Sequence, residues 1–297
     1  MKKNEYLDIA KRLEKFSSRQ TQIEIPDVIY HYCSLDSFTK IIESGSLFLT
    51  HHSGMNDRSD SILFYEILIE TAQKKATKEN FQILEKFIYT FYLNIKDYFI
   101  ASFSKKPDLL NQWKMYGDNG NGISIGFRTE SLYVKPQIPY FSSESEMGRG
   151  IFPLEYISET DFQLADELLN LAIDGWFNIP PNVENLILAK KHNSFISEEE
   201  IRIVEIQDTR ININPDFPSL LTNNVGEHFN YRIKNNEKII PYRIFPFKTN
   251  FEKYSLQNIW LGPLNKSNPN YIRLFLEKNN IDLVEGIFRS KSPYTGY

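Results

Sequence analysis

The sequence predicts an α+β domain built on a mixed, partly split sheet. Segments with strand-like alternation are interleaved at irregular spacing with segments of helical periodicity. The chain has 297 residues, of which 41% are hydrophobic, so it can bury a large core. It contains no internal repeat and no low-complexity linker. We therefore interpret residues 1–297 as one elaborated domain, with a helical insertion at about 60–97 and variable loops at about 133–150 and 208–236.

The composition argues against several classes of protein. No apolar run approaches the roughly 18 residues of a membrane helix, and residues 1–5 lead into an amphipathic pattern rather than a secretory signal. We therefore expect a cytoplasmic protein with no membrane partner. The formal net charge of −4 disfavours broad binding of nucleic acid, although a local basic groove is compatible with it.

The single cysteine, Cys33, excludes an internal disulfide and a zinc site built from cysteines. A lone thiol can act as a nucleophile. Cys33 lies inside a strand pattern with hydrophobic neighbours, and this context predicts a buried, inert thiol instead.

The first elements are an amphipathic helix at 4–16 and a strand that begins after Pro26. Ser34 is a candidate N-cap for a short helix with an apolar face, and Gly45 is its C-terminal stop. A strand at 46–50 follows. This strand, helix, strand unit predicts a cleft that receives polar groups from both strand ends, namely Tyr30, His31, Thr50 and His51.

The rest of the chain alternates between the two kinds of pattern. Helical periodicity predicts helices at 60–76, 78–96, 109–116, 161–177, 183–192 and 270–279. Alternating or β-rich patterns predict strands at 98–104, 123–127, 151–157, 200–206, 258–261 and 281–288. The polar stretch 51–60 is expected to be a loop, and 208–236 is expected to be loop-like with weak strands.

Three consecutive glutamates mark the most informative segment, residues 195–202. On a strand, Glu198 and Glu200 point to the same side, so they can face one site, while Arg202 can orient the carboxylate of Glu200. A solvated acidic turn is the alternative. Cleavage of the bond between nicotinamide and ribose develops oxocarbenium-like charge, which a carboxylate stabilises. A histidine such as His31 can hold a ribose, and a tyrosine can stack on nicotinamide.

A third group of polar and aromatic residues can line the same cleft. It consists of Ser102 and Ser104 at a strand end and Gln112, Trp113 and Tyr116 on the helix that follows. Helical spacing also allows Trp113 and Tyr116 to be core residues. The glycines form neither a phosphate-loop nor a dinucleotide-binding fingerprint.

Metal and hydrolase sites have weaker support. His51 and His52 with Asp57 and Asp60 can bind a divalent ion, but adjacent histidines point apart on an extended chain. No G-x-S-x-G elbow is present. We therefore predict no metal site.

Motifs along nearly the whole chain resemble the bacterial family of unknown function DUF2971. These motifs include Tyr30, His31 and Tyr32, the Asn56 and Asp57 loop, Phe103 and Ser104, residues 112–117, Gly126 and Phe127, residues 195–202, Trp260 to Pro263, and Ser290 to Tyr294. The chain departs from the family at Arg58, where a proline is usual, and at Ile201, where a tryptophan is usual. These departures affect loop shape and packing more than charge.

The family's motifs are in turn similar to those of the ADP-ribosyltransferase superfamily, in its H-Y-E subgroup. This resemblance implies a split, two-sheet α+β core with added helices. It also implies that His31 binds the adenosine-side ribose of NAD, that Tyr32 or Tyr116 stacks on nicotinamide, and that Glu200 is catalytic. We assign Glu198 to the catalytic pair as well. Tyr30, Thr50, Ser102, Ser104, Gln112, Trp113 and Arg202 are the further NAD-binding candidates.

The sequence therefore predicts an NAD-dependent ADP-ribosyltransferase that acts as a bacterial toxin or phage-defence effector. Net acidity favours a protein acceptor, whereas the resemblance favours RNA or DNA, which we prefer. An antitoxin is a further candidate partner. The alternative is a non-catalytic nucleotide-sensing or partner-binding module with the same fold, and nuclease or deaminase activity is a more distant alternative.

Overall fold

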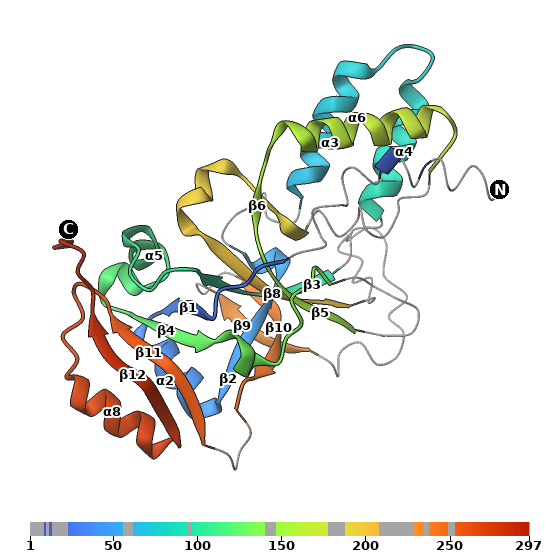
Figure 1. Cartoon of the computed structure of the whole chain (residues 1–297). Helices are drawn as coiled ribbons and strands as arrows, with labels where there is room; N and C mark the ends of the chain where they lie inside the picture. The colour runs from blue at the N-terminus through green and yellow to red at the C-terminus, as the bar shows by residue number, and fades with distance from the viewer. Residues whose placement is uncertain are drawn as a thin grey trace.

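The computed structural model describes residues 9, 12–13, 23–55, 62–93, 97–139, 147–177, 188–207, 229–234, 238–248 and 253–296. These residues form an α+β fold with a mixed sheet, as predicted (Figure 1). The strands of the main sheet are β1 (Val28–Cys33), β2 (Ser46–His51), β3 (Asp97–Ser104), β4 (Ile123–Arg128), β5 (Met147–Pro153), β8 (Glu200–Gln207), β9 (Asn230–Lys234), β10 (Lys238–Pro246), β11 (Tyr254–Leu261) and β12 (Ile281–Arg289).

The sheet divides at β3. Strand β8 pairs with β3 along its whole length, from Asp97 to Ser104, and pairs with β5 on its other side. The remaining edge of β3 is shared by two strands, because β2 pairs near Ile100 and β1 pairs at Ser104. One branch continues through β4, β11 and β12, and the other through β10 and β9. The β11 and β12 pair is parallel and the other pairs of this sheet are antiparallel.

One face of this sheet carries the main hydrophobic core, and we call it the core face. Its side chains alternate along each strand with those of the opposite face, because successive residues of a strand point to opposite sides. The residues of this face include Ile29, Leu47, Leu49, Phe99, Phe103, Ile123, Ile125, Phe127, Ile201, Ile203, Ile259 and Leu261. Helices α2 (Leu35–Ser44) and α8 (Pro269–Lys278) contribute to the same cluster and cover this face.

Helix α2 has the ends that its sequence predicts. The hydroxyl of Ser34 accepts a hydrogen bond from the backbone N–H of Ser37 (3.1 Å) and so caps the first turn. Gly45 has φ of 61°, and its N–H donates to the carbonyl of Ile41. Glycine adopts this left-handed conformation without the steric cost of a side chain, so the helix stops there.

Helices α3 (Leu63–Lys75), α4 (Phe81–Leu93) and α6 (Glu159–Ile173) pack together at the upper right of Figure 1 and have a separate hydrophobic cluster. Helices α3 and α4 lie within the ranges 60–76 and 78–96 where helices are predicted, and α6 joins them from a later part of the chain. The two-stranded ladder of β6 (Glu155–Tyr156) and β7 (Lys190–Lys191) lies between this helical group and the main sheet. The shorter helices are α5 (Leu110–Met115) and the 3-10 helices η2 (His52–Gly54), η3 (Asp118–Gly120), η4 (Thr129–Leu132) and η6 (Asn193–Glu198).

Several predicted elements were wrong in part. The end of the predicted helix at 183–192 is the strand β7, because Lys190 and Lys191 extend to reach carboxylates on separate elements. The predicted strand at 151–157 is two strands, β5 and β6. Strand β10 was missed altogether. Residues 183–187 lie outside the described residues.

Some predictions fall largely on residues that the structure does not describe. Of the predicted helix at 4–16, only Ile9, Arg12 and Leu13 are described, and they are helical. Asn56, Asp57, Arg58 and Asp60 lie outside the described residues. Within the described ranges, no helix combines the length and the apolar character needed to cross a membrane.

Candidate functional site

Glu198 and Glu200 converge on one buried ammonium group, that of Lys191. Nζ of Lys191 lies 2.6 Å from Oε2 of Glu198 and also pairs with Oε2 of Glu200. The predicted proximity of the two glutamates is therefore present, but its predicted cause was wrong. Glu198 ends η6, Glu199 turns the chain with a left-handed φ of 46°, and only Glu200 belongs to a strand. This turn brings the two carboxylates together.

Arg202 completes what we call the Lys191 cluster, which consists of Lys191, Glu198, Glu200 and Arg202. Nε of Arg202 donates to Oε1 of Glu200 (2.7 Å), as its position two residues along the strand predicts. Burial alone favours the neutral form of Glu200, but Arg202 and Lys191 outweigh it and lower the pKa of this carboxyl to about 2. Glu200 is therefore an ionised carboxylate throughout the physiological range of pH.

Lys191 was missed by the sequence reasoning, which assigned it to a helix. Burial lowers its pKa, but the charges of Glu200 and Glu198 reverse this effect, and the net shift is upward. Its ammonium also lies 4.7 Å from the ring centroid of Phe195, a cation–π distance. The signal that could have revealed Lys191 is the pair of adjacent lysines, Lys190 and Lys191. On a β-strand two neighbouring side chains point to opposite sides, so each lysine can reach a different carboxylate.

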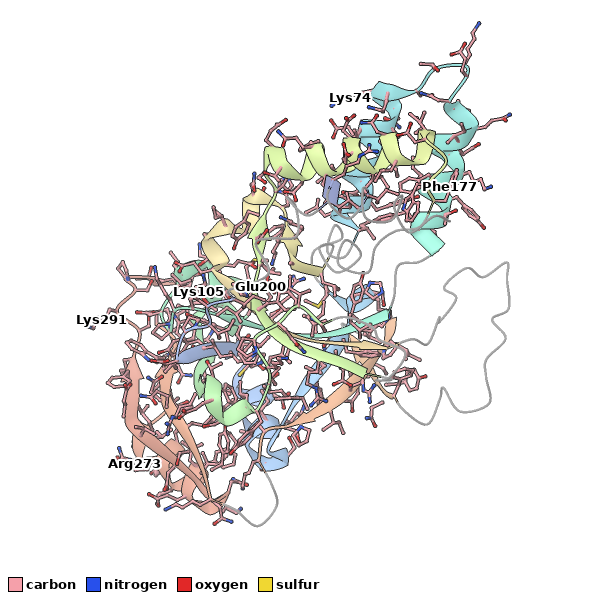
Figure 2. All side chains as sticks on the ribbon, turned by 45° about the vertical axis from the view of Figure 1, so that its right-hand side comes forward. Lys74, Lys105, Phe177, Glu200, Arg273 and Lys291 are labelled. Atoms are coloured by element: carbon pink, nitrogen blue, oxygen red, sulfur yellow. The ribbon has the colours of Figure 1, made fainter. Side chains whose placement is uncertain are left out.

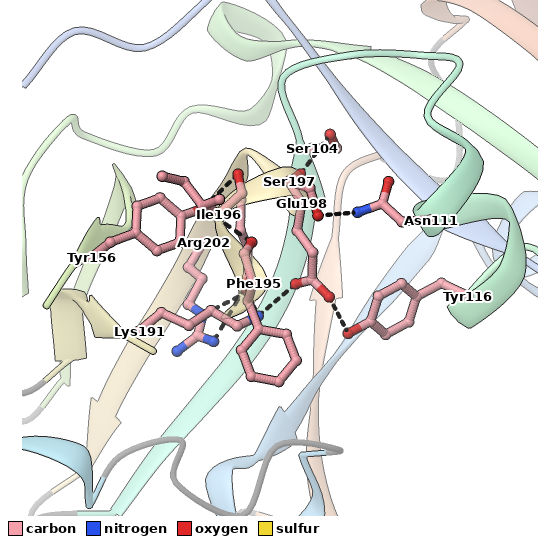
Figure 3. Close-up of polar contacts among 11 residues, drawn as sticks. Ser104, Asn111, Tyr116, Tyr156, Lys191, Phe195, Ile196, Ser197, Glu198 and Arg202 are labelled. Carbon is pink, nitrogen blue, oxygen red and sulfur yellow. Dashed lines mark hydrogen bonds and ion pairs between the residues drawn. The ribbon is translucent and has the colours of Figure 1, made fainter. Parts of the chain in front are cut away.

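An aromatic rim borders the Lys191 cluster and consists of Tyr116, Tyr156 and Phe195, all partly exposed (Figure 3). The hydroxyl of Tyr116 donates to Oε1 of Glu198 (3.3 Å), and burial together with Glu198 raises the pKa of this phenol. The hydroxyl of Tyr156 lies 3.4 Å from the carbonyl oxygen of Phe195. Glu200 itself is only 4% exposed and lies well inside the protein (Figure 2). The rim is therefore the more exposed part of the site, and the cluster is its buried part.

Tyr32 and Trp113 belong to the support of the site rather than to its rim. The hydroxyl of Tyr32 donates to the carbonyl of Lys106 (2.9 Å) and accepts from the N–H of Leu109 (2.9 Å), so it fixes the loop before α5. Trp113 is fully buried, with its ring edge on Tyr32 and its Nε1 donating to Asp108 (2.7 Å). The alternative reading of Trp113 as a core residue is confirmed. Gln112 is also buried.

The register places several candidate residues in one row across the sheet. Tyr30 lies opposite Ser104, and Ser104 lies opposite Glu200, so these three residues point to the same side. We call this side the site face. The hydroxyl of Ser104 donates to the carbonyl of Glu198 (2.9 Å) and holds the end of η6. The hydroxyl of Ser102, on the same face, is buried without a hydrogen-bond partner among the described residues.

His31 lies on the other side of the sheet. It pairs in register with Ile125 of the core, and its ring packs edge-on against Phe103, 5.7 Å between centroids. Its Nδ1 lies 3.0 Å from the carbonyl oxygen of Ser102, and burial lowers the pKa of the imidazole. Tyr30 and His31 therefore do not face one cleft, since neighbouring residues of a strand alternate. The structure does not bring His31 to the Lys191 cluster.

Thr50 is on the site face but in the other branch of the sheet. It lies opposite Ile100, which lies opposite Val204, four residues along β8 from Glu200. This offset corresponds to about 13 Å along the strand. The hydroxyl of Thr50 accepts a hydrogen bond from Arg232 (2.7 Å) rather than from a residue of the Lys191 cluster.

Among the described residues, no group of histidine, cysteine and carboxylate side chains is arranged to hold a metal ion. His51 caps η2 through Ser53, 2.8 Å from Nδ1 to the hydroxyl, and Asp57 and Asp60 lie outside the described residues. Cys33 is buried, as predicted, and burial raises the pKa of its thiol. The described residues thus give no support to a nucleophilic role for Cys33.

The fold and the site together define an α+β protein with a buried lysine, glutamate and arginine cluster under an aromatic rim. Residues 112–203 match the model of the family DUF2971, which is described as a protein of unknown function. The predicted resemblance to this family is confirmed over these residues, which include most of α5, the strand β4 and the whole Lys191 cluster. No curated protein and no solved structure gives a significant match.

Proposed function

We propose that the protein is an NAD-dependent ADP-ribosyltransferase of the cytoplasm, acting as a bacterial toxin or phage-defence effector, with its reaction centre at the Lys191 cluster. The observation that carries the proposal is the convergence of Glu198 and Glu200 on Lys191, with the hydroxyl of Tyr116 3.3 Å from Glu198. The split, two-sheet core of that superfamily is part of the same proposal. The fork of the sheet at β3 supports it.

The residues of the site fit the nicotinamide end of NAD. Nicotinamide is a flat, positively charged ring in NAD, and the rim offers the ring of Tyr116 beside the carboxylate of Glu198 and the ring of Phe195 beside Lys191, which pairs with both glutamates. NAD supplies a ribosyl group whose C1′ gains positive charge as its bond to nicotinamide breaks. A carboxylate held next to that atom lowers the energy of this charge. For the adenosine end, His31 gives no support, because it lies on the core face.

The two glutamates have different proposed tasks. Glu200 has its pKa lowered to about 2, so it stays ionised and acts through its charge rather than as a proton acceptor. Oε1 of Glu198 accepts the hydrogen bond of Tyr116, which is partly exposed, so we propose that Glu198 removes the proton from the acceptor nucleophile. Lys191 and Arg202 are positioning residues, because they hold both carboxylates in place.

The test is transfer of label from adenine-labelled NAD to a cell extract. We expect Glu198→Gln to lower the rate about 100-fold, in the range for loss of a general base. Glu199→Gln is the matched control. It lies in the same acidic run, but its side chain pairs with Lys106 at the surface, 2.8 Å apart, so its rate should equal that of the wild type. No transfer by the wild type, or equal transfer by Glu198→Gln, would overturn the proposal.

A second function is favoured by the way the carboxylate of Glu200 is bound. Arg202 occupies Oε1, and Lys191 occupies Oε2 together with a longer contact from Arg202 (3.4 Å). Both oxygens of this carboxylate are thus already bound by cations of the protein. Such a carboxylate suits a module that binds a nucleotide without catalysing its reaction. A thermal-shift measurement with NAD separates the two functions, since a shift without transfer favours this module.

A further inference from the structure

The end of the sheet formed by β2, β9 and β10 carries basic and aromatic side chains on the site face. Register assigns Phe48, Arg232, Lys238, Tyr242 and Ile244 to this face. Phe48 is 39% exposed and Ile244 is 49% exposed, so the apolar part of this surface is open to solvent. We call these five residues the β10 surface.

Two rings and a guanidinium group lie against one another in the β10 surface. The ring centroids of Phe48 and Tyr242 are 4.2 Å apart with planes inclined by 33°, and Cζ of Arg232 lies 5.9 Å from the centroid of Phe48. Arg232 is fixed by its bond to Thr50, while its Nε is buried without a partner among the described residues. Flat groups are thus presented in a fixed arrangement.

The segment that contains β9 and β10 is positively charged, whereas the chain as a whole is negatively charged. Residues 229–248 contain five lysines and arginines and a single carboxylate, Glu237, whereas the whole chain has a net charge of −4. The described residues of β2, β9 and β10 include no aspartate or glutamate. From β8, Glu205 pairs with Arg243, 2.9 Å apart, but these two residues belong to the core face.

We propose that the β10 surface binds a single-stranded nucleic acid. Bases can stack on the exposed ring of Phe48 and on the guanidinium of Arg232, and phosphates can pair with Arg232 and Lys238. A single strand is favoured over a duplex because its base faces are free to stack. The surface shares the site face with Glu200. A role in presenting an acceptor to the Lys191 cluster rests on the proposed function, whereas the binding itself does not.

The test is fluorescence anisotropy of the full chain with labelled oligouridylate and oligothymidylate, without NAD. We expect binding that weakens with salt, with the slope of log affinity against log salt reduced by about 0.7 in Arg232→Ala. We expect Phe48→Ala to weaken binding about 10-fold, in the range for loss of one stacked base. Lys238→Ala provides a second test of phosphate binding and should also weaken it. The side chain of Lys238 is exposed, so its removal leaves the core intact.

Arg273→Ala is the matched control, because Arg273 is an exposed arginine on α8, the helix that covers the core face rather than the site face (Figure 2). Its affinity should equal that of the wild type. The proposal is overturned if no oligonucleotide binds at low salt, if Arg232→Ala and Arg273→Ala bind equally, or if a polyglutamate peptide competes as well as the oligonucleotide. The last result would identify an acidic protein as the partner. Failure of label transfer with intact oligonucleotide binding would count against the proposed reaction alone.

Discussion

Nζ of Lys191 lies 2.6 Å from Oε2 of Glu198, which is seven positions later in the sequence, at the end of the 3-10 helix η6. The same ammonium pairs with Glu200, so one lysine joins the end of η6 to the start of β8. Both partners are almost fully buried, with side chains 4% and 6% exposed. The geometry of the proposed site therefore depends on Lys191.

Replacing Lys191 should be strongly destabilising. Lys191→Met leaves two buried carboxylates with Arg202 as the remaining cation of the cluster, and removal of one partner from a buried ion pair costs about 3–5 kcal/mol. Urea denaturation measures the loss. Lys74→Met is the control, since Lys74 forms an exposed pair with Glu70 and should cost less than about 0.5 kcal/mol. Equal stability of the two variants would contradict the account of the cluster.

Stability should fall in acid because of Glu200. Its pKa is about 2 in the folded protein and near 4.5 in the unfolded chain, so the unfolded state binds more protons between these values. The contribution is complete above about pH 5 and is lost as pH falls toward 2. In urea denaturation, the advantage of the wild type over Glu200→Gln should shrink by about 1.4 kcal/mol per pH unit in this window. A constant difference would contradict the lowered pKa.

His31 should affect packing rather than binding of NAD. His31→Phe keeps a ring against Phe103 but removes the hydrogen bond to Ser102, so we expect a loss of about 1 kcal/mol in the free energy of unfolding. The affinity for NAD, measured by calorimetry, should change by less than about twofold. The family resemblance implies instead that His31 holds a ribose. A tenfold or larger loss of affinity, about 1.4 kcal/mol, would support that role.

Cys33 should be unreactive in the native protein. Its thiol is buried, and burial raises its pKa, so little thiolate is available for attack. We expect labelling by a maleimide to follow global unfolding, with complete reaction only in denaturant. Rapid stoichiometric labelling under native conditions would show that the strand opens locally and that the thiol is accessible.

Gly122 should not tolerate a side chain. A Cβ at this position would lie 2.2 Å from the carbonyl oxygen of Cys33 and 2.8 Å from the backbone of Gly117, so backbone must move. We expect Gly122→Ala to cost about 3 kcal/mol, at the upper end for overpacking. Gly175→Ala is the control, because Gly175 has φ of 90° but open space around it, and strain alone should cost about 1 kcal/mol. Gly122→Ala should therefore have the lower melting temperature of the two variants, and the reverse order would contradict the prediction.

Local patterns were sufficient to predict much of the fold. Ser34 and Gly45 delimit α2 because capping chemistry acts within a few residues. The strands at 98–104 and 200–206 were predicted closely from alternation, although both of their faces are buried, one in the main core and the other partly in a second hydrophobic cluster. Strand β10 was missed because both of its faces mix apolar and charged residues, which gives no clear period.

The site was predicted only in part, because its decisive contacts are long-range. The pairing of Glu200 with Arg202 follows from strand period. The approach of Glu198 depends on the left-handed turn at Glu199, and the contribution of Lys191 depends on the β6 and β7 ladder. The register between β1 and β4 sends His31 to the core face, and no pattern within one strand reveals which face will be covered.

The central claim is that NAD reacts at the Lys191 cluster, and a crystal structure of the Glu198→Gln variant with bound NAD tests it most directly. We predict the nicotinamide ring against Tyr116 or Phe195, with the attached ribose within hydrogen-bonding reach of Glu200. NAD bound on the core face beside His31, or a protein that takes up no NAD at saturating concentration, would contradict the claim.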